Sequence, residues 1–372
     1  MNADKIFQYL QTKQNVLLTG APGTGKSRLM NEVAFQFEHP VTTVSNLHTN
    51  PDNIPQIRVN SQTVPIPALA QNDNGQNIVP MLKRKNRKVF RATLHQNSKY
   101  RDFMTGIVPV LDGTNGYEIY EGILYRANEF AKQPDSSALL IIDELNRGPA
   151  IEVFGNAIVA LETDKRLDSN NQISAHTQLF ELVTKNGTVD YALSPHLYIL
   201  AAVNQADVSV APLDVAFLRR WQSVFLHPDY EPLYNKFLVN KYAPIPESAT
   251  SVEDVYHVAI KALEKINKKI SIGKGEEYQI GQGAFLSTEP AGTSINDALD
   301  FVLDCWNIIF AHINEVFYGD SNIIAYIVNA NKYNSPYSLE EVSFAEETRL
   351  ILIHTDIDRQ TIYNLYRAAS ED

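Results

Sequence analysis

Residues 15–27 read Asn15-Val-Leu-Leu-Thr-Gly20-Ala-Pro-Gly-Thr-Gly25-Lys26-Ser27, and they carry the clearest indication of the fold. The apolar run predicts a strand over 15–19, and a helix follows to about Phe37. Gly20 to Ser27 match the spacing G-x-x-x-x-G-K-[ST], in which glycines let backbone N–H groups wrap around phosphate oxygens. A tight glycine turn is the alternative, but the coincidence of strand, pattern and helix favours a phosphate-binding loop.

This loop predicts a site for a nucleoside triphosphate with Mg²⁺. The N-terminus of the following helix adds partial positive charge beside the phosphates. We expect Lys26 to contact the β- and γ-phosphates and Ser27 to ligate Mg²⁺. The residues expected to bind the nucleotide are Gly20, Ala21, Pro22, Gly23, Thr24, Gly25, Lys26, Ser27 and Arg28.

A second apolar run delivers two carboxylates. Ala138 to Ile142 is typical of a strand buried on both faces of a parallel sheet, and Asp143 and Glu144 follow it. Because ligands of open α/β sheets bind at the carboxyl ends of strands, we expect Asp143 to hold Mg²⁺, directly or through water. Glu144 is then the general base that polarises the attacking water. The alternative, an acidic pair that merely ends a surface strand, is disfavoured by the phosphate-binding loop.

Two further polar positions follow along the chain. Leu197 to Val203 predicts another buried strand, and Asn204 at its end would position the water or touch the γ-phosphate. The alternative for Asn204 is a turn-forming asparagine. Arg219 and Arg220 end a short predicted helix. Either one reaches the γ-phosphate bound by a neighbouring subunit, or both compensate the helix dipole, and spacing alone does not decide.

The order of these elements predicts two domains. Strands separated by helices indicate an α/β domain with a parallel sheet over residues 1–228. It contains a Pro-, Asn- and Gln-rich insertion at about 40–88 with weak periodicity. Behind it, over 229–372, long helices are predicted, two of them starting at the capping signatures Ser251 to Asp254 and Ser294 to Asp297.

Length, composition and charge limit the number of domains, the kinds of site and the cellular location that we expect. A chain of 372 residues predicts one large and one smaller domain, and the net charge of −11 argues against a broad nucleic-acid-binding surface. The single cysteine, Cys305, lies in an apolar helical pattern, so an intramolecular disulfide and a zinc–cysteine site are excluded. With no apolar run of about 18 residues and no signal-peptide pattern, we expect a cytoplasmic protein without membrane contact.

One basic run stands out against the acidic composition. It extends from Lys83 to Lys88 and is followed by Arg91. It could face DNA or an acidic partner. The alternative, which we favour, is a solvated loop that leads into a strand over 88–94.

The loop, the acidic strand, Asn204 and the arginine pair, in this order, resemble AAA+ ATPases of the branch that contains MoxR and dynein-related modules. Within that branch the chain looks like the McrB family, the NTPase subunits of modification-dependent restriction systems. The most specific stretch is Leu94-His95-Gln96-Asn97-Ser98-Lys99-Tyr100-Arg101-Asp102-Phe103-Met104-Thr105-Gly106, because general AAA+ proteins lack it. Ile141 to Gly148, Asn204 to Asp207 and Ile280 to Phe285 resemble the family's I-I-D-E-I-N-R-A/G, N-T-A-D and I-G-H-S-Y-F.

The resemblance implies a fold, an activity and partners. The fold is an α/β AAA+ domain with a central parallel sheet, followed by a smaller all-α lid and a C-terminal helical region. The activity is hydrolysis of GTP or ATP with Mg²⁺ between subunits of a hexameric homo-oligomeric ring, with Arg219 and Arg220 as trans-acting arginines. Asn146 and Arg147 would lie at the subunit interface. The partner is an McrC-like protein that stimulates hydrolysis and carries the nuclease, and DNA is reached through the complex.

Departures from the family leave two questions open. Val208 stands where McrB has an arginine after N-T-A-D, and Gln282 and Ala284 replace the His and Tyr of the lid motif, so the base preference does not transfer. The loop begins at residue 20, so we expect no N-terminal DNA-recognition domain ahead of it. Two alternatives remain, a MoxR-like remodelling ATPase that acts on a protein client and a non-catalytic ring scaffold. Glu144 argues against the scaffold.

Overall fold

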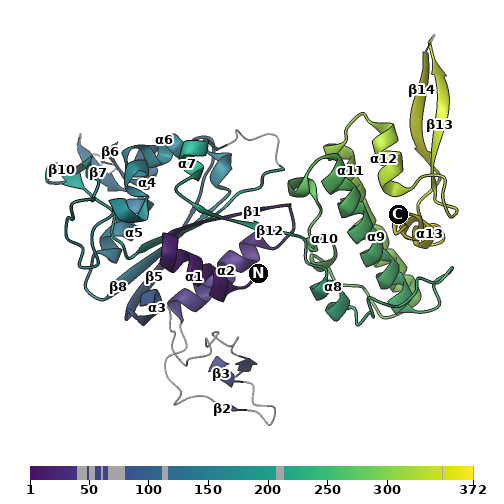
Figure 1. The fold of residues 1–372 in the computed structure, drawn as a ribbon, viewed down its shortest axis with the longest axis horizontal. Coiled ribbons are helices and arrows are strands. Elements are labelled where there is room, and N and C mark those ends of the chain that lie inside the picture. The colour runs from purple at the N-terminus through teal and green to yellow at the C-terminus, as the bar shows by residue number, and fades with distance from the viewer. Residues whose placement is uncertain are drawn as a thin grey trace. The chain divides into compact units, whose positions relative to one another are not determined.

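The computed structural model describes residues 1–39, 48–49, 55–59, 62–65, 80–110, 116–206, 213–345 and 347–371 (Figure 1). The chain divides into two compact units. The first contains most of residues 1–225. The second contains the loop Gly20–Gly25, the short stretch Asn204–Ala206 and the chain from Leu226 onward.

A five-stranded sheet forms the centre of the first unit. Its strands are β1 (Asn15–Gly20), β5 (Asn86–Thr93), β8 (Ser136–Asp143), β11 (Leu197–Ala202) and β12 (Gln222–Leu226), in the order β12-β1-β11-β8-β5. β1 pairs with β11, β11 with β8, and β8 with β5, each time in parallel. The predicted parallel sheet is confirmed. Every residue of β1 and β11 is buried, as expected for strands covered on both faces.

Helices pack against the sheet through alternating strand residues. The helix α1 (Ala3–Lys13) packs on α2 (Lys26–Glu38), which contacts β5, β8 and β11. Leu140 and Ile142 of β8 share a hydrophobic core with Leu124 of α5 (Ile123–Ala131). Because successive side chains of a strand point to opposite faces, Leu139 and Ile141 face the other side of the sheet.

Shorter elements complete the first unit. They are α3 (Pro80–Lys83), α4 (Tyr100–Phe103), α6 (Ala150–Phe154) and α7 (Val215–Leu218), with the hairpins β6 (Thr105–Pro109) to β7 (Tyr117–Glu121) and β9 (Phe180–Thr184) to β10 (Gly187–Tyr191). Within the predicted insertion, β2 (His48–Thr49), β3 (Pro55–Val59) and β4 (Gln62–Pro65) form an antiparallel sheet. The remaining insertion residues up to Val79 lie outside the described residues, as do Asp207 and Val208.

Two long helices organise the second unit. α9 (Val252–Gly273) and α11 (Ile295–Val316) begin at capping boxes formed by Ser251 with Asp254 and by Ser294 with Asp297, which confirms the predicted starts. Their apolar faces form one core with residues of α8 (Glu231–Lys236), α10 (Gly283–Leu286), α12 (Ser321–Val328) and α13 (Ile362–Ala369). Cys305 is buried in this core, as predicted. Among the described helices, none combines the length and apolarity that crossing a bilayer requires.

The second unit also contains a hairpin that the predicted helical region did not include. β13 (Tyr337–Phe344) pairs antiparallel with β14 (Glu347–His354), and the two strands extend from the helices (Figure 1). Tyr337 is buried at the base, whereas Val342 and Ile351 are exposed. An apolar run as short as 350–353 does not distinguish a strand from a helix, so periodicity missed this hairpin.

Candidate nucleotide-binding site

The carboxyl ends of three parallel strands meet at one edge of the sheet. β1 ends at Gly20, β8 at Asp143 and β11 at Ala202, in the registers Leu18 to Ala202 and Ala201 to Ile142. α2 starts at Lys26, directly after the glycine-rich loop, and Asn204 follows β11 by two residues. The residues predicted to bind the phosphates and the metal thus follow strands that end at the same edge.

The backbone of the loop explains its three glycines. Gly20, Gly23 and Gly25 have φ values of 134°, 74° and 91°, in the region that L side chains rarely adopt. The hydroxyl of Thr24, a buried side chain, donates to the carbonyl oxygen of Ala21 at 2.9 Å and closes the turn. Ser27 and Arg28 are exposed.

Ser27 and Asp143 are in direct contact. The Ser27 hydroxyl donates to Oδ2 of Asp143 at 3.2 Å, although 116 residues separate them in sequence. The other carboxylate oxygen of Asp143, Oδ1, accepts the backbone N–H of Glu144 at 3.0 Å. Hydroxyl and carboxylate oxygens are the hard ligands that Mg²⁺ prefers, so this pair fits the predicted ion.

Lys26 is desolvated beside these carboxylates. Only 7% of the residue is exposed. Burial lowers the pKa of its ammonium group to about 8, and the charges of Glu144 and Asp143 act in the opposite direction. A cation that has already lost most of its water interacts strongly with an incoming phosphate.

Glu144 adopts a strained backbone conformation. Its φ of 53° and ψ of 48° lie in the left-handed region, which costs a non-glycine residue about 1 kcal/mol or more. Its carboxylate oxygen Oε2 lies 3.2 Å from Nε of Arg147. Such strain concentrates at functional sites, and here it falls on the residue predicted as general base.

The family-specific stretch from Leu94 onward packs against this segment. Thr93, the last residue of β5, pairs with Asp143. A Cβ atom on Gly148 would lie 2.7 Å from the carbonyl oxygen of His95 and 2.9 Å from Cβ of Leu94. Only glycine therefore allows the two stretches to approach, which gives a physical reason for their joint presence in the sequence.

The arginine pair lies at the opposite edge of the sheet. Nδ2 of Asn15, the first residue of β1, donates to the backbone carbonyl of Arg220 at 3.1 Å. β1 then runs to Gly20, and at about 3.3 Å per residue the loop is about 16 Å away. The structure therefore does not bring Arg219 and Arg220 to the Ser27 and Asp143 of their own chain.

Glu162, to which the sequence analysis assigned no role, contacts both arginines. Its Oε1 lies 3.3 Å from Nε of Arg220 and 3.8 Å from Nη2 of Arg219. The Arg219 side chain is 66% exposed, whereas that of Arg220 is 10% exposed. The two arginines thus have different surroundings, and only Arg219 projects into solvent.

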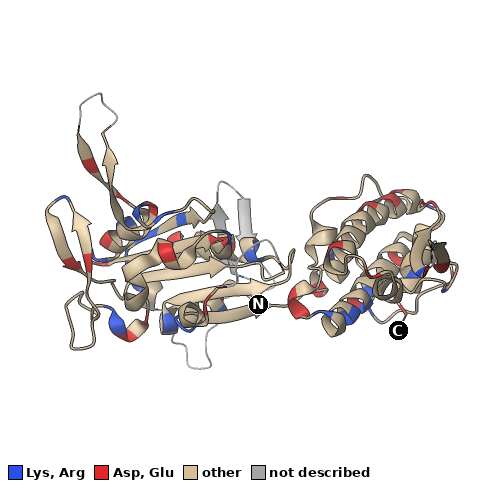
Figure 2. Cartoon of the chain, turned by 90° about the horizontal axis from the view of Figure 1, so that it is seen from above, with Lys and Arg blue, Asp and Glu red and all other residues tan. Residues whose placement is uncertain are grey.

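The basic run is largely engaged in contacts within the first unit. Arg84 donates to the carbonyl oxygen of Ser136 at 3.2 Å, and Arg87 donates to that of Phe37 at 2.8 Å. Lys88 lies 5.1 Å from the ring centre of Phe90. Figure 2 shows basic and acidic segments distributed over both units. The predicted loop is therefore short, because α3 ends at Lys83 and β5 already begins at Asn86. The contacts favour a structural role of the run over a dedicated DNA-binding patch.

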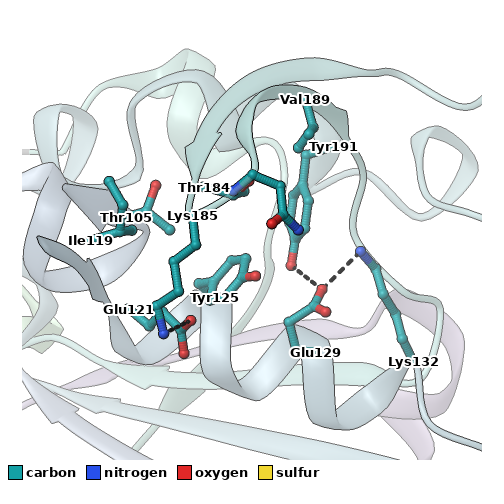
Figure 3. A pocket seen from close by; sticks show the side chains of 11 residues that line it. Thr105, Ile119, Glu121, Tyr125, Glu129, Lys132, Thr184, Lys185, Val189 and Tyr191 are labelled. Carbon is teal, nitrogen blue, oxygen red and sulfur yellow. Dashed lines mark hydrogen bonds and ion pairs between the residues drawn. The ribbon is translucent and has the colours of Figure 1, made fainter. Parts of the chain in front are cut away.

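A cavity of about 330 Å³ lies between the two hairpins and α5 (Figure 3). Its charged lining residues pair with one another, Lys185 with Glu121 at 3.1 Å and Lys132 with Glu129 at 3.0 Å. Tyr191 donates its hydroxyl to the same Glu129 at 2.7 Å. The cavity is therefore a polar packing defect between these elements, and its charges already neutralise each other.

Known proteins show what this chain resembles. Residues 74–221 match the family model described as the AAA domain, dynein-related subfamily. The chain is 27% identical over 294 residues to the type IV methyl-directed restriction enzyme EcoKMcrB subunit of Escherichia coli (strain K12), covering 78% of this chain and 51% of that protein. It is 29% identical over 222 residues to the type II restriction enzyme BsuMI component YdiS of Bacillus subtilis (strain 168), covering 57% of each.

These matches confirm the predicted AAA fold and the resemblance to McrB. The chain spans about half the length of these two relatives. The family model covers Asp143, Glu144 and the arginine pair, whereas the glycine-rich loop precedes it.

Proposed function

We propose that this chain, which has an AAA domain and is similar to McrB restriction subunits, is the motor or switch subunit of a restriction or antiviral defence system. It hydrolyses GTP or ATP, and this hydrolysis drives an McrC-like nuclease partner that acts on DNA. Both relatives are restriction-enzyme components, which supports the proposal. The observation that carries its catalytic part is the contact of Ser27 with Asp143 beside the buried Lys26.

Each polar group at the carboxyl edge has a distinct task in this proposal. The loop N–H groups and Lys26 bind the β- and γ-phosphates. Ser27 and Asp143 would hold Mg²⁺, which would neutralise phosphate charge when bound. Glu144 accepts a proton from the attacking water, and Asn204 orients that water. We assign residues 1–228 to the nucleotide-binding domain and 229–372 to the lid and the C-terminal region.

The position of the arginine pair supports sites shared between copies of the chain. Arginines at the far edge of the sheet do not stabilise charge on the γ-phosphate bound to their own loop. In a ring, the proposed hexamer, the same edge faces the loop of a neighbour. We assign the trans-acting role to the exposed Arg219 and a positioning role to the largely buried Arg220.

Phosphate release by the purified chain tests this function. We would measure it with GTP and with ATP, each with and without an McrC-like protein. The proposal predicts turnover that rises when this partner is added. Turnover with ATP that is indifferent to the partner and rises with a protein client would instead indicate a remodelling ATPase. Nucleotide-dependent assembly without turnover would indicate a scaffold.

A further inference from the structure

A three-residue segment of the second unit lies along the phosphate loop. The backbone N–H groups of Gly281 and Gly283 donate to the carbonyl oxygens of Pro22 and Gly23, each at 2.9 Å. Between them, Nε2 of Gln282 donates to the carbonyl oxygen of Thr24 at 3.1 Å, across 258 residues of sequence. Three consecutive carbonyl groups of the loop thus accept hydrogen bonds from one side.

These contacts determine where the loop directs its N–H groups. In a planar trans peptide the carbonyl group and the next N–H group point in opposite directions. Hydrogen bonds to the carbonyl oxygens of residues 22, 23 and 24 therefore turn the N–H groups of Gly23, Thr24 and Gly25 to the opposite side. Converging N–H groups of this kind form an anion site.

The approach of the two segments leaves no room for a side chain. A Cβ atom on Gly281 would lie 2.0 Å from the carbonyl carbon of Gly23 and 2.3 Å from the nitrogen of Thr24. A Cβ atom on Gly283 would lie 2.9 Å from the carbonyl oxygen of Gly23. Gln282 is consequently the one residue of this segment that touches the loop with a side chain.

Both polar atoms of the Gln282 side-chain amide form hydrogen bonds. While Nε2 donates to Thr24, Oε1 accepts the backbone N–H of Asp229 at 3.1 Å. Asp229 lies just ahead of α8, so the amide connects the loop to the start of the helices. The partners fix the orientation of the amide, because one is a carbonyl acceptor and the other an N–H donor.

We propose that Gln282 is a positioning residue for nucleotide binding, which holds the Thr24 carbonyl so that the loop N–H groups face the phosphates. The inference rests on the proposed function, because it concerns the same nucleotide site. It predicts that loss of the amide donor weakens nucleotide binding and leaves the chemical step unchanged.

The test is Gln282→Glu in the full chain. The carboxylate keeps an acceptor for Asp229 and removes the donor to Thr24. We expect the Kd of fluorescent GTP and ATP analogues to rise about three- to tenfold, the range for one hydrogen bond. KM should rise by the same factor while kcat stays constant. A purely structural residue would instead lower the melting temperature and the active fraction and leave KM unchanged.

Two further variants complete the design. Gln279→Glu is the matched control, since Gln279 donates to the carbonyl oxygen of Asn267 at 3.3 Å and not to the loop. Gln282→His, the residue of the family motif, offers one donor and one acceptor when neutral. Because a ring N–H can donate to Thr24 in both charge states of the imidazole, its KM should stay close to that of the wild type.

Each outcome decides between the two proposals. If the wild-type chain binds neither GTP nor ATP, the proposed function fails and this inference fails with it. If the wild type binds nucleotide and Gln282→Glu binds as tightly, only the inference fails. If Gln282→Glu does not fold, Gln282→Leu decides, because leucine also lacks the donor and a KM equal to that of the wild type would overturn the positioning role.

Discussion

Substitutions of two residues at the carboxyl edge of the sheet should affect nucleotide binding and hydrolysis separately. Lys26→Ala removes the buried ammonium that we propose binds the phosphates and should weaken nucleotide binding about a hundredfold, since hydrogen bonds to charged groups are strong. Glu144→Gln should preserve binding and lower kcat about 10²- to 10⁴-fold, because the general base is lost. Isothermal titration and phosphate release measure the two effects independently. Normal turnover by the Glu144→Gln protein would show that another group is the base.

The pKa of Lys26 gives nucleotide binding a predictable pH dependence. Its pKa is lowered to about 8 in the free protein, and bound phosphate favours the protonated form. Above pH 8 the site must first take up a proton, so affinity is full below this pH and falls above it. We expect Kd to rise about tenfold between pH 7 and pH 9.

Titration with a fluorescent nucleotide at pH 7, 8 and 9 checks this expectation. Lys26→Arg is the control, because a guanidinium stays charged throughout this range and its Kd should be constant. A wild-type Kd that does not change with pH would mean that the ammonium retains an ordinary pKa.

The sequence predicted which residues form the site, but it did not predict all of the side chains that these residues contact. The spacing of the loop and the acidic end of a buried run together predicted Ser27 and Asp143 at one edge, where the structure has them in contact. Glu162 and Gln282 were not predicted as contacts. The contact of Glu162 with Arg220 and that of Gln282 with Thr24 each join residues that are far apart in the sequence. No local sequence pattern indicates such a contact.

At the scale of elements, a buried arginine joins the strand that leads into the loop to its neighbour. Arg166 is 1% exposed. It donates to Oδ1 of Asn15 on β1 at 2.7 Å and to the carbonyl oxygens of Ser194 at 3.2 Å and Leu161 at 3.3 Å. It also donates to the carbonyl oxygen of Leu197, the first residue of β11.

Arg166→Leu should lower the free energy of unfolding by about 2–4 kcal/mol, because several buried acceptors would lose their donor at once. Urea denaturation measures this difference. Arg126→Leu, the same substitution at an exposed position of α5, should change stability by about 0.5 kcal/mol or less. Equal midpoints for the two variants would contradict a role for Arg166 in joining the strands.

The helices and strands that could be predicted are those with a clear local sequence pattern, such as an apolar run or a capping residue. β8 and β11 carry unbroken apolar runs, and α9 and α11 carry capping residues, so their types and approximate positions were predicted. The hairpin β9–β10 has mostly exposed residues at its tip and a mixed composition, and its strands are five residues each. Such strands depend on pairing with one another, which a local window does not detect.

For the whole molecule, the proposed function requires catalytic sites that are shared between copies of the chain. Each chain has a loop at one edge of its sheet and an exposed Arg219 at the other. In the proposed ring, a subunit with an intact loop would need an intact arginine from its neighbour. This requirement makes two different inactive variants complementary.

The most direct test mixes Lys26→Ala subunits with Arg219→Ala subunits at equal concentration and measures phosphate release. Each variant alone should be inactive, and random mixing should restore about one quarter of the wild-type rate, since half of the loops are intact and half of those meet an intact arginine. Activity restored to this level would support a shared site. No restoration, in a mixture that still assembles, would contradict it and place hydrolysis within single chains.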